Sequence, residues 1–198
     1  MNESEIEKML VDNGALLEGH FLLTSGRHSG RYIEKFRILE KPALTSRLCG
    51  ELANRFRGKS IACVVGPVTG GIILAFEVAR QLGCRAVYAE RDESGTGFAL
   101  RRGFALAQGE RVLVVEDIVT TGGSVKQVID VVRRHQGDVV GVGLLVDRSG
   151  GSVDYGAPNV EALLRLDIET YAPDDVPAEL LAKHGPAIKP GSSKQPVK

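Results

Sequence analysis

Residues 112–124, which read VLVVEDIVTTGGS, constrain the fold of this chain more than any other stretch. Four consecutive apolar residues at the start are typical of a central parallel strand that is buried on both faces. Glu116 and Asp117 follow at the carboxyl end of that strand, where open α/β sheets bind their ligands. The stretch therefore predicts an α/β fold with a ligand site at this strand end.

The second half of the stretch predicts a phosphate-binding turn. Residues 120–124 offer three hydroxyls, two glycines and backbone N–H groups that can close around an anion. The next residues have helical apolar spacing, so a positive helix N-terminus would point at the phosphate. Two acids beside an anion site suit a sugar phosphate, whose hydroxyls the acids would bind. The alternative interpretation is an ordinary turn in which Thr121 or Ser124 caps the helix and the acids are solvated.

Alternating strand and helix patterns predict a central, mostly parallel sheet flanked by helices. We expect a small N-terminal subdomain in residues 1–40, a core in residues 41–184 and a disordered tail in residues 185–198, which are rich in Gly, Pro, Ser and Lys. The expected strands are 21–24, 32–37, 61–65, 86–90, 112–117, 139–146 and, at one edge, 160–166; the expected helices include 4–11, 42–56 and 72–82.

Composition indicates a soluble protein with one sizeable core. The chain has 198 residues, 43% of them hydrophobic, and its 25 basic and 25 acidic residues cancel. This balance gives no case for nucleic acid or membrane as a partner. The charged N-terminus is unlike a secretory signal, so a cytoplasmic location is expected. The three cysteines, Cys49, Cys63 and Cys84, are expected to be reduced and mostly buried.

Residues 112–124 resemble the 5-phosphoribosyl-1-pyrophosphate (PRPP) motif of the type I phosphoribosyltransferases. Residues 19–35, GHFLLTSGRHSGRYIEK, are similar to the N-terminal base-binding segment of orotate phosphoribosyltransferases. The resemblance implies the type I fold with a small base-binding subdomain. It also implies transfer of ribose 5-phosphate from PRPP to orotate, giving orotidine 5′-monophosphate and pyrophosphate in pyrimidine biosynthesis, with Mg²⁺ as cofactor.

The resemblance assigns roles to the donor-binding residues. Glu116 and Asp117 would bind the ribose hydroxyls and support positive charge on the ring. Mg²⁺ would lie near them but be carried mainly by PRPP and water, so no protein ligand is assigned to it. A second glycine-rich turn at residues 66–71 would bind pyrophosphate, unless it is only a tight strand-to-helix connection. The expected PRPP-binding residues are Thr69, Gly70, Arg91, Glu116, Asp117, Ile118, Val119, Thr120, Thr121, Gly122, Gly123 and Ser124.

The resemblance also assigns the base site and the subunit arrangement. Arg148 would pair with the orotate carboxylate, a task suited to a planar bidentate donor. Tyr32 and Ile33 would wall the base, and Thr120 would lie near it. Arg91 would contact pyrophosphate in the neighbouring subunit of a homodimer with shared active sites. The expected catalytic residues are Glu116, Asp117, Arg91 and Arg101.

Three lysine positions of many family members differ in this chain, at Thr24, Gly70 and the acidic loop of residues 92–97. Arg101 and Arg102 are the candidate replacements. If residues 98–104 alternate on two short strands, the two arginines face opposite sides and only one reaches the site. Two other functions stay open: a phosphoribosyltransferase for a purine or other base, and a non-catalytic regulator that senses PRPP.

Overall fold

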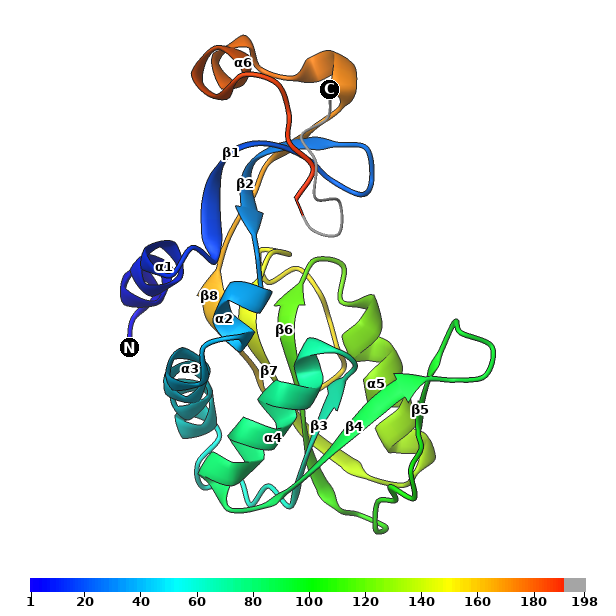
Figure 1. The fold of residues 1–198 in the computed structure, drawn as a ribbon. Helices are drawn as coiled ribbons and strands as arrows, with labels where there is room; N and C mark the ends of the chain where they lie inside the picture. Colours follow the sequence, from blue (N-terminus) through cyan, green and yellow to red (C-terminus); the bar gives the residue numbers. More distant parts are fainter. Residues whose placement is uncertain (191–198) are drawn as a thin grey trace.

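A six-stranded sheet forms the centre of the computed structural model, which describes residues 1–190 (Figure 1). Neighbouring strands are parallel except for the antiparallel pair β4 and β5 at one edge. This mostly parallel sheet confirms the predicted fold class. The strand order is β5 (Phe98–Leu100), β4 (Arg85–Arg91), β3 (Cys63–Pro67), β6 (Arg111–Val119), β7 (Asp138–Asp147) and β8 (Val160–Arg165).

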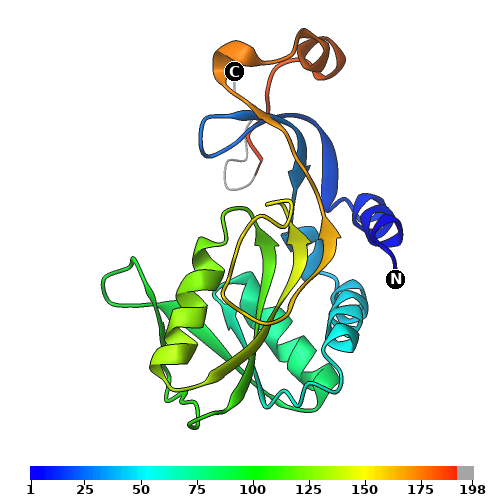
Figure 2. The same cartoon turned by 180° about the vertical axis from the view of Figure 1, so that it is seen from behind.

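Helices cover both faces of this sheet. Helices α3 (Pro42–Arg55) and α4 (Gly70–Leu82) lie on one face, and α5 (Gly123–Arg134) lies on the other (Figures 1 and 2). Leu113 of β6 belongs to the core beneath α3 and α4, whereas Val114 belongs to the core beneath α5. Strand β6 is therefore buried on both faces, as its apolar run predicts.

A smaller sheet lies beyond the carboxyl ends of the parallel strands (Figures 1 and 2). It contains β1 (Leu16–Leu22), β2 (His28–Ile33) and β9 (Thr170–Tyr171), and the short helices η1 (Pro173–Asp175) and α6 (Ala178–His184) follow. We call these five elements the hood. Because β9 and α6 come late in the chain, the hood is not limited to the N-terminal residues in which the sequence places it.

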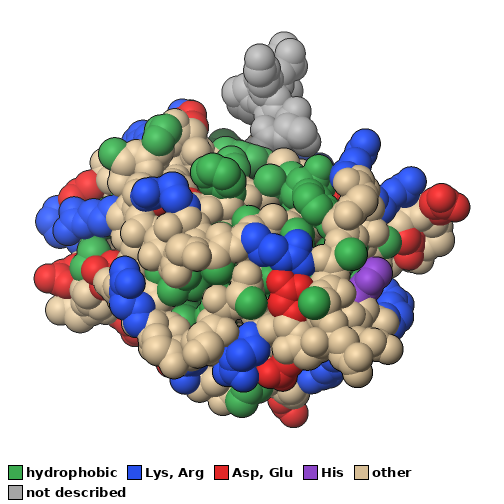
Figure 3. All heavy atoms as spheres, turned by 90° about the horizontal axis from the view of Figure 1, so that it is seen from below, with side chains coloured by type: hydrophobic (Ala, Val, Ile, Leu, Met, Phe, Trp, Pro, Cys, Tyr) green, Lys and Arg blue, Asp and Glu red, His purple; other side chains and the backbone are tan. Residues whose placement is uncertain are grey.

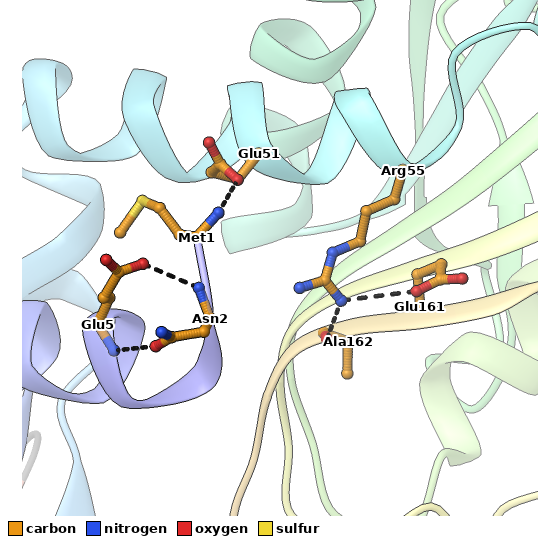
Figure 4. A network of polar contacts seen from close by, with 7 residues as sticks. All are labelled: Met1, Asn2, Glu5, Glu51, Arg55, Glu161 and Ala162. Carbon is orange, nitrogen blue, oxygen red and sulfur yellow. Dashed lines mark hydrogen bonds and ion pairs between the residues drawn. The ribbon is translucent and has the colours of Figure 1, made fainter.

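Helix α1 (Glu3–Asp12) is fixed to the core by polar contacts near its start (Figure 4). Asn2 and Glu5 form a capping box, in which each side chain accepts a hydrogen bond from the other's backbone N–H at 2.9 Å. The amino group of Met1 lies 2.7 Å from Glu51 of α3. These contacts place the N-terminal helix beside α3.

Three local predictions are wrong. Residues 34–37 do not extend β2, because the chain turns there into helix α2 (Phe36–Leu39), whose Ile38 and Leu39 are buried. Beyond β5 the chain forms a turn, because Arg102 and Gly103 have φ of 58° and 79°. Residues 185–190, expected to be disordered, instead reach β1: the Ile188 N–H donates to the His20 carbonyl at 2.8 Å. The other residues of the predicted tail lie outside the described residues.

The surface carries both charges, and the cysteines are free thiols. Basic and acidic side chains are interspersed on the face seen from below in Figure 3. Within residues 1–190, no helix has the length and apolar character needed to cross a membrane. Cys49 and Cys63 are buried, all three cysteines are free thiols, and burial raises the pKa of Cys49 and of Cys63 to about 12. The cysteines are thus reduced and mostly buried, as predicted.

Candidate functional site

The turn between β6 and α5 encloses a small cavity of about 80 Å³, lined by Glu116 and residues 118–125. Gly122 has φ 75°, and a Cβ there would lie 2.6 Å from Val153 Cγ1 and 3.0 Å from Tyr155 Cε1. Only glycine fits that conformation and space. No side chain caps α5, so the alternative in which Thr121 or Ser124 is the cap is wrong. The first N–H groups of the helix therefore have no side-chain acceptor and can bind an anion.

The two acids at the end of β6 are buried, with Glu116 8% and Asp117 2% exposed. The Asp117 N–H donates to Glu116 Oε1 at 3.1 Å, and the Ile118 N–H donates to Asp117 Oδ1 at 2.7 Å. Burial and the neighbouring Asp117 charge raise the pKa of Glu116 to about 8. At neutral pH the Glu116 carboxyl is therefore largely protonated.

Lys35, for which the sequence analysis gave no role, pairs with the second acid. Its Nζ lies 2.9 Å from Asp117 Oδ2 and 3.3 Å from Oδ1. Only the longer contact has hydrogen-bond geometry, so Oδ2 is in an ion pair but has no hydrogen-bond partner. The pair joins positions 82 residues apart, and no sequence pattern marks such a contact.

The glycine-rich turn of residues 66–71 meets the turn between β6 and α5 at Asp117. Thr69 directly precedes α4, and its peptide bond with Val68 is cis. A Cβ on Gly70 would lie 1.8 Å from Asp117 Oδ2, so only glycine allows α4 to begin this close to the carboxylate. The fold thus brings together the two turns that the sequence analysis assigned to PRPP, which lie on the neighbouring strands β3 and β6.

An open cleft of about 750 Å³ extends from this acid toward the hood. It contains three predicted site residues from distant parts of the chain, Tyr32, Ile33 and Arg148, beside Asp117. The lining residues are Tyr32, Ile33, Glu34, Lys35, Phe36, Arg37, Glu40, Asp117, Ile118 and Arg148.

Arg148 lines the cleft just after the end of β7 and forms no ion pair with an acid of residues 1–190. Its N–H donates to the Val119 carbonyl at 2.8 Å, which fixes the start of its side chain. Its Nε is buried and has no hydrogen-bond partner among residues 1–190. Burial lowers the pKa of Arg148, and Tyr32 opposes this effect. A partly buried guanidinium whose Nε has no partner among residues 1–190 is suited to a ligand carboxylate.

Three predicted or candidate arginines lie away from both cavities. The Arg91 guanidinium stacks on Phe98, 4.2 Å from the ring centre. Arg102 donates to Glu90 at 2.8 and 3.1 Å. Arg101 has only a 3.9 Å contact with the exposed Glu93 and lines a separate surface hollow. Arg101 is thus the less engaged of the two candidate replacements.

The acids can accommodate a divalent cation only indirectly. Carboxylate oxygens suit Mg²⁺, but Glu116 is largely protonated and Lys35 offsets the charge of Asp117. The described residues contain no cluster of three or more His, Cys, Asp or Glu side chains placed to hold a metal. The site fits a hydrated cation that arrives on an anionic ligand.

Known proteins match this chain in sequence and in fold. The model of the phosphoribosyl transferase domain matches residues 37–162. An orotate phosphoribosyltransferase of Desulforamulus reducens is 52% identical over 193 residues, which cover 97% of this chain and 98% of that protein. The crystal structure of orotate phosphoribosyltransferase from Aeropyrum pernix has a TM-score of 0.69 at 28% identity, covering 90% of this chain and 97% of that one. An adenine phosphoribosyltransferase from Thermoanaerobacter pseudethanolicus has a TM-score of 0.58 at 17% identity, covering 69% of this chain and 88% of that one, and shows the shared fold alone.

Proposed function

The chain belongs to the phosphoribosyl transferase family, and from this membership we propose that it is an orotate phosphoribosyltransferase. It transfers ribose 5-phosphate from PRPP to N1 of orotate and releases orotidine 5′-monophosphate and pyrophosphate. The observation that carries the proposal is the cleft in which the buried acid Asp117 and the unpartnered Arg148 line one space. Relatives named for this activity match nearly the whole chain.

In the donor half, the 5′-phosphate binds in the small cavity at residues 118–125. Backbone N–H groups at the start of α5 and the hydroxyls of Thr120, Thr121 and Ser124 donate to its oxygens. Asp117 Oδ2, which has no hydrogen-bond partner, accepts from a ribose hydroxyl, and Glu116 lies beside it. The pyrophosphate lies at the turn that contains Thr69 and Gly70, where α4 begins.

In the acceptor half, Arg148 pairs with the orotate carboxylate, and its position in the cleft supports this role. Tyr32 and Ile33 from the hood wall one side of the base, and Thr120 lies at its edge. The base and the donor then meet above the carboxyl end of β6, where parallel α/β sheets bind ligands.

The reaction breaks the bond between the ribose anomeric carbon and the pyrophosphate oxygen and forms a bond from that carbon to N1, whose proton is released to solvent. The electron pair of the broken bond leaves with pyrophosphate. Positive charge develops on the ring in the transition state, and the carboxylate of Asp117 stabilises it. Mg²⁺ carried by the donor would neutralise charge on the pyrophosphate, and Glu116 and Asp117 would contact its water. The protein otherwise acts by holding the two substrates in line.

In the proposed homodimer, Arg91 and Arg101 act in the active site of the partner subunit. Both are exposed and neither is among the residues that line the two cavities of the described chain. Arg91 ends β4 and Arg101 follows β5, so the two arginines flank this antiparallel pair at the edge of the sheet (Figure 1). They are suited to bind the pyrophosphate of a partner subunit. Mg²⁺, the homodimer and a cytoplasmic location stay predictions.

The test is turnover by purified protein with Mg²⁺, PRPP and orotate, whose absorbance differs from that of its nucleotide. We expect orotate to be consumed and pyrophosphate released in equal amounts. Consumption of adenine or another purine in place of orotate would identify a different base. PRPP binding without turnover of any base would identify a regulator.

A further inference from the structure

Lys35 lies between the donor motif and the cleft. Its ammonium contacts both oxygens of Asp117, at 2.9 and 3.3 Å, while its side chain is 33% exposed. It lies two residues after the end of β2, as the N-cap residue of α2, so the segment that joins the hood strand with Tyr32 and Ile33 to this short helix positions the cation. An ammonium has three donors and Asp117 satisfies one with good geometry, which leaves donors for a second anion.

The charge around Lys35 favours a ligand anion. Three basic residues line the cleft: Lys35, Arg37 and Arg148. Arg37 is exposed and pairs with Glu40 at 3.0 Å, so its charge is already offset. Arg148 and Lys35 both lie close enough to Tyr32 to lower its pKa, but among the described residues only Lys35 also contacts Asp117. In the described chain, Lys35 is therefore the cation at the donor end of the cleft.

Helix α4 begins beside the Asp117 carboxylate that Lys35 contacts. The Cα of Gly70 touches the Asp117 carboxylate so closely that a Cβ would overlap it, and that carboxylate contacts Lys35. The helix has no side-chain cap, so its first N–H groups have no side-chain acceptor. An anion at this helix start lies within reach of the lysine, whose long stem can move.

We propose that Lys35 binds the pyrophosphate leaving group while it remains paired with Asp117. This inference rests on the proposed function and deepens it. The lysine links the residue that faces the developing ring cation with the group that carries away the negative charge. It supplies from the start of α2 a positive charge that the glycine-rich turn of residues 66–71 does not contain.

Binding of three ligands to purified protein tests the role: Mg²⁺–pyrophosphate, Mg²⁺–PRPP and ribose 5-phosphate, by titration calorimetry. Lys35→Met keeps the stem and removes the charge. We expect it to weaken binding of pyrophosphate and PRPP about tenfold or more, from the loss of a charge-assisted hydrogen bond. Ribose 5-phosphate, which lacks the leaving group, should change by less than about threefold. Lys35→Gln serves the same comparison if Lys35→Met loses the fold.

Two controls separate leaving-group binding from a role that is only structural. Arg37→Met removes a basic residue from the same cleft and should leave pyrophosphate affinity within about twofold, since its charge is offset. In an Asp117→Asn background, Lys35→Met should still weaken pyrophosphate binding about tenfold. If that loss disappears, or if ribose 5-phosphate weakens as much as pyrophosphate, Lys35 only orients Asp117 and the inference is overturned. Failure of the wild-type protein to bind PRPP would instead refute the proposed function.

Discussion

In the proposed function, Arg148 is the residue on which the choice of base depends. Arg148→Ala should raise the KM for orotate by about 10- to 100-fold, because a charge-assisted contact to the carboxylate is lost. The KM for PRPP should change little. Steady-state kinetics with each substrate varied in turn measures both values. Equal increases in both would show that Arg148 does not contact the base.

The raised pKa of Glu116 predicts that the folded protein loses stability as the pH rises. Its pKa is raised from 4.5 to about 8 in the folded protein. Above pH 4.5 unfolding releases a proton that the folded state retains, so its contribution to stability falls as pH rises and is fully lost above about pH 8. The slope from this one group is at most about 1.4 kcal/mol per pH unit.

Glu116→Gln removes that proton release while keeping the shape of the side chain. Thermal melting from pH 5 to 9 should therefore show a flatter Tm profile for the variant than for the wild-type protein. The variant should be the more stable protein at pH 9. Parallel profiles would show that Glu116 titrates in the folded state much as it does in the unfolded chain.

Which site residues could be predicted depended on whether they lie in local patterns. The strand-to-turn run at residues 112–124 identified the acids and the phosphate turn, because their chemistry is contiguous in sequence. Lys35 was inside the quoted base-binding segment, yet its contact with Asp117 forms only when the start of α2 folds against the end of β6. The orphaned Nε of Arg148 likewise depends on tertiary burial.

Among the elements, the start of α4 is the most closely packed against the site. Gly70→Ala places a methyl group where Asp117 Oδ2 now lies, 1.8 Å from the ideal Cβ position. The carboxylate or the helix must move, so kcat/KM for PRPP should fall by about 10²-fold. Initial rates at low PRPP measure this effect.

Gly50→Ala in α3 is the matched control for this substitution. Its Cβ would meet only Gln81, at 3.8 Å, which is ordinary contact. Helix-interior alanine is more favourable than glycine, so this variant should keep full activity and gain about 0.5–1 kcal/mol in stability. An unchanged rate in Gly70→Ala would mean that Asp117 relocates without consequence for the donor.

The elements that were predicted well are those in which apolar residues recur at a regular spacing along the sequence. Helix α3 begins at Pro42 as expected, and the apolar face that includes Leu48 and Leu52 is buried. Strand β1 begins earlier than predicted because residues 16–18 pair with β2, whereas Gly19 and His20 lie in an irregularity of that pairing that hides the strand pattern in the sequence. Helix α2 was missed because four residues are too few to show a period.

For the molecule as a whole, the distance of Arg91 from the cleft of its own chain leads to a test of shared sites. Arg91→Ala and Asp117→Asn should each lower kcat by about 10² or more if each residue stabilises charge at the reaction centre. Mixed dimers would have one site with both wild-type residues. Random reassortment makes half of the dimers mixed, so activity should rise to roughly a quarter of the wild-type value.

The mixing experiment needs proof that subunits exchange, which differently tagged variants provide. Activity equal to the mean of the two parents after complete exchange would place Arg91 in the site of its own chain. A monomer by sedimentation at working concentration would contradict the arrangement directly.

The hood draws its parts from both ends of the chain, and this determines the order in which the cleft can form during synthesis. The parallel strands of the core are all present once β8 has been made. Strand β2, with Tyr32 and Ile33, emerges early, but its neighbour β9 and the segment through Ile188 that pairs with β1 emerge last. On the ribosome, the parallel core with the turn between β6 and α5 can therefore fold first, and the side of the cleft formed by Tyr32 and Ile33 gains its remaining neighbours only after β9 and Ile188 have been made.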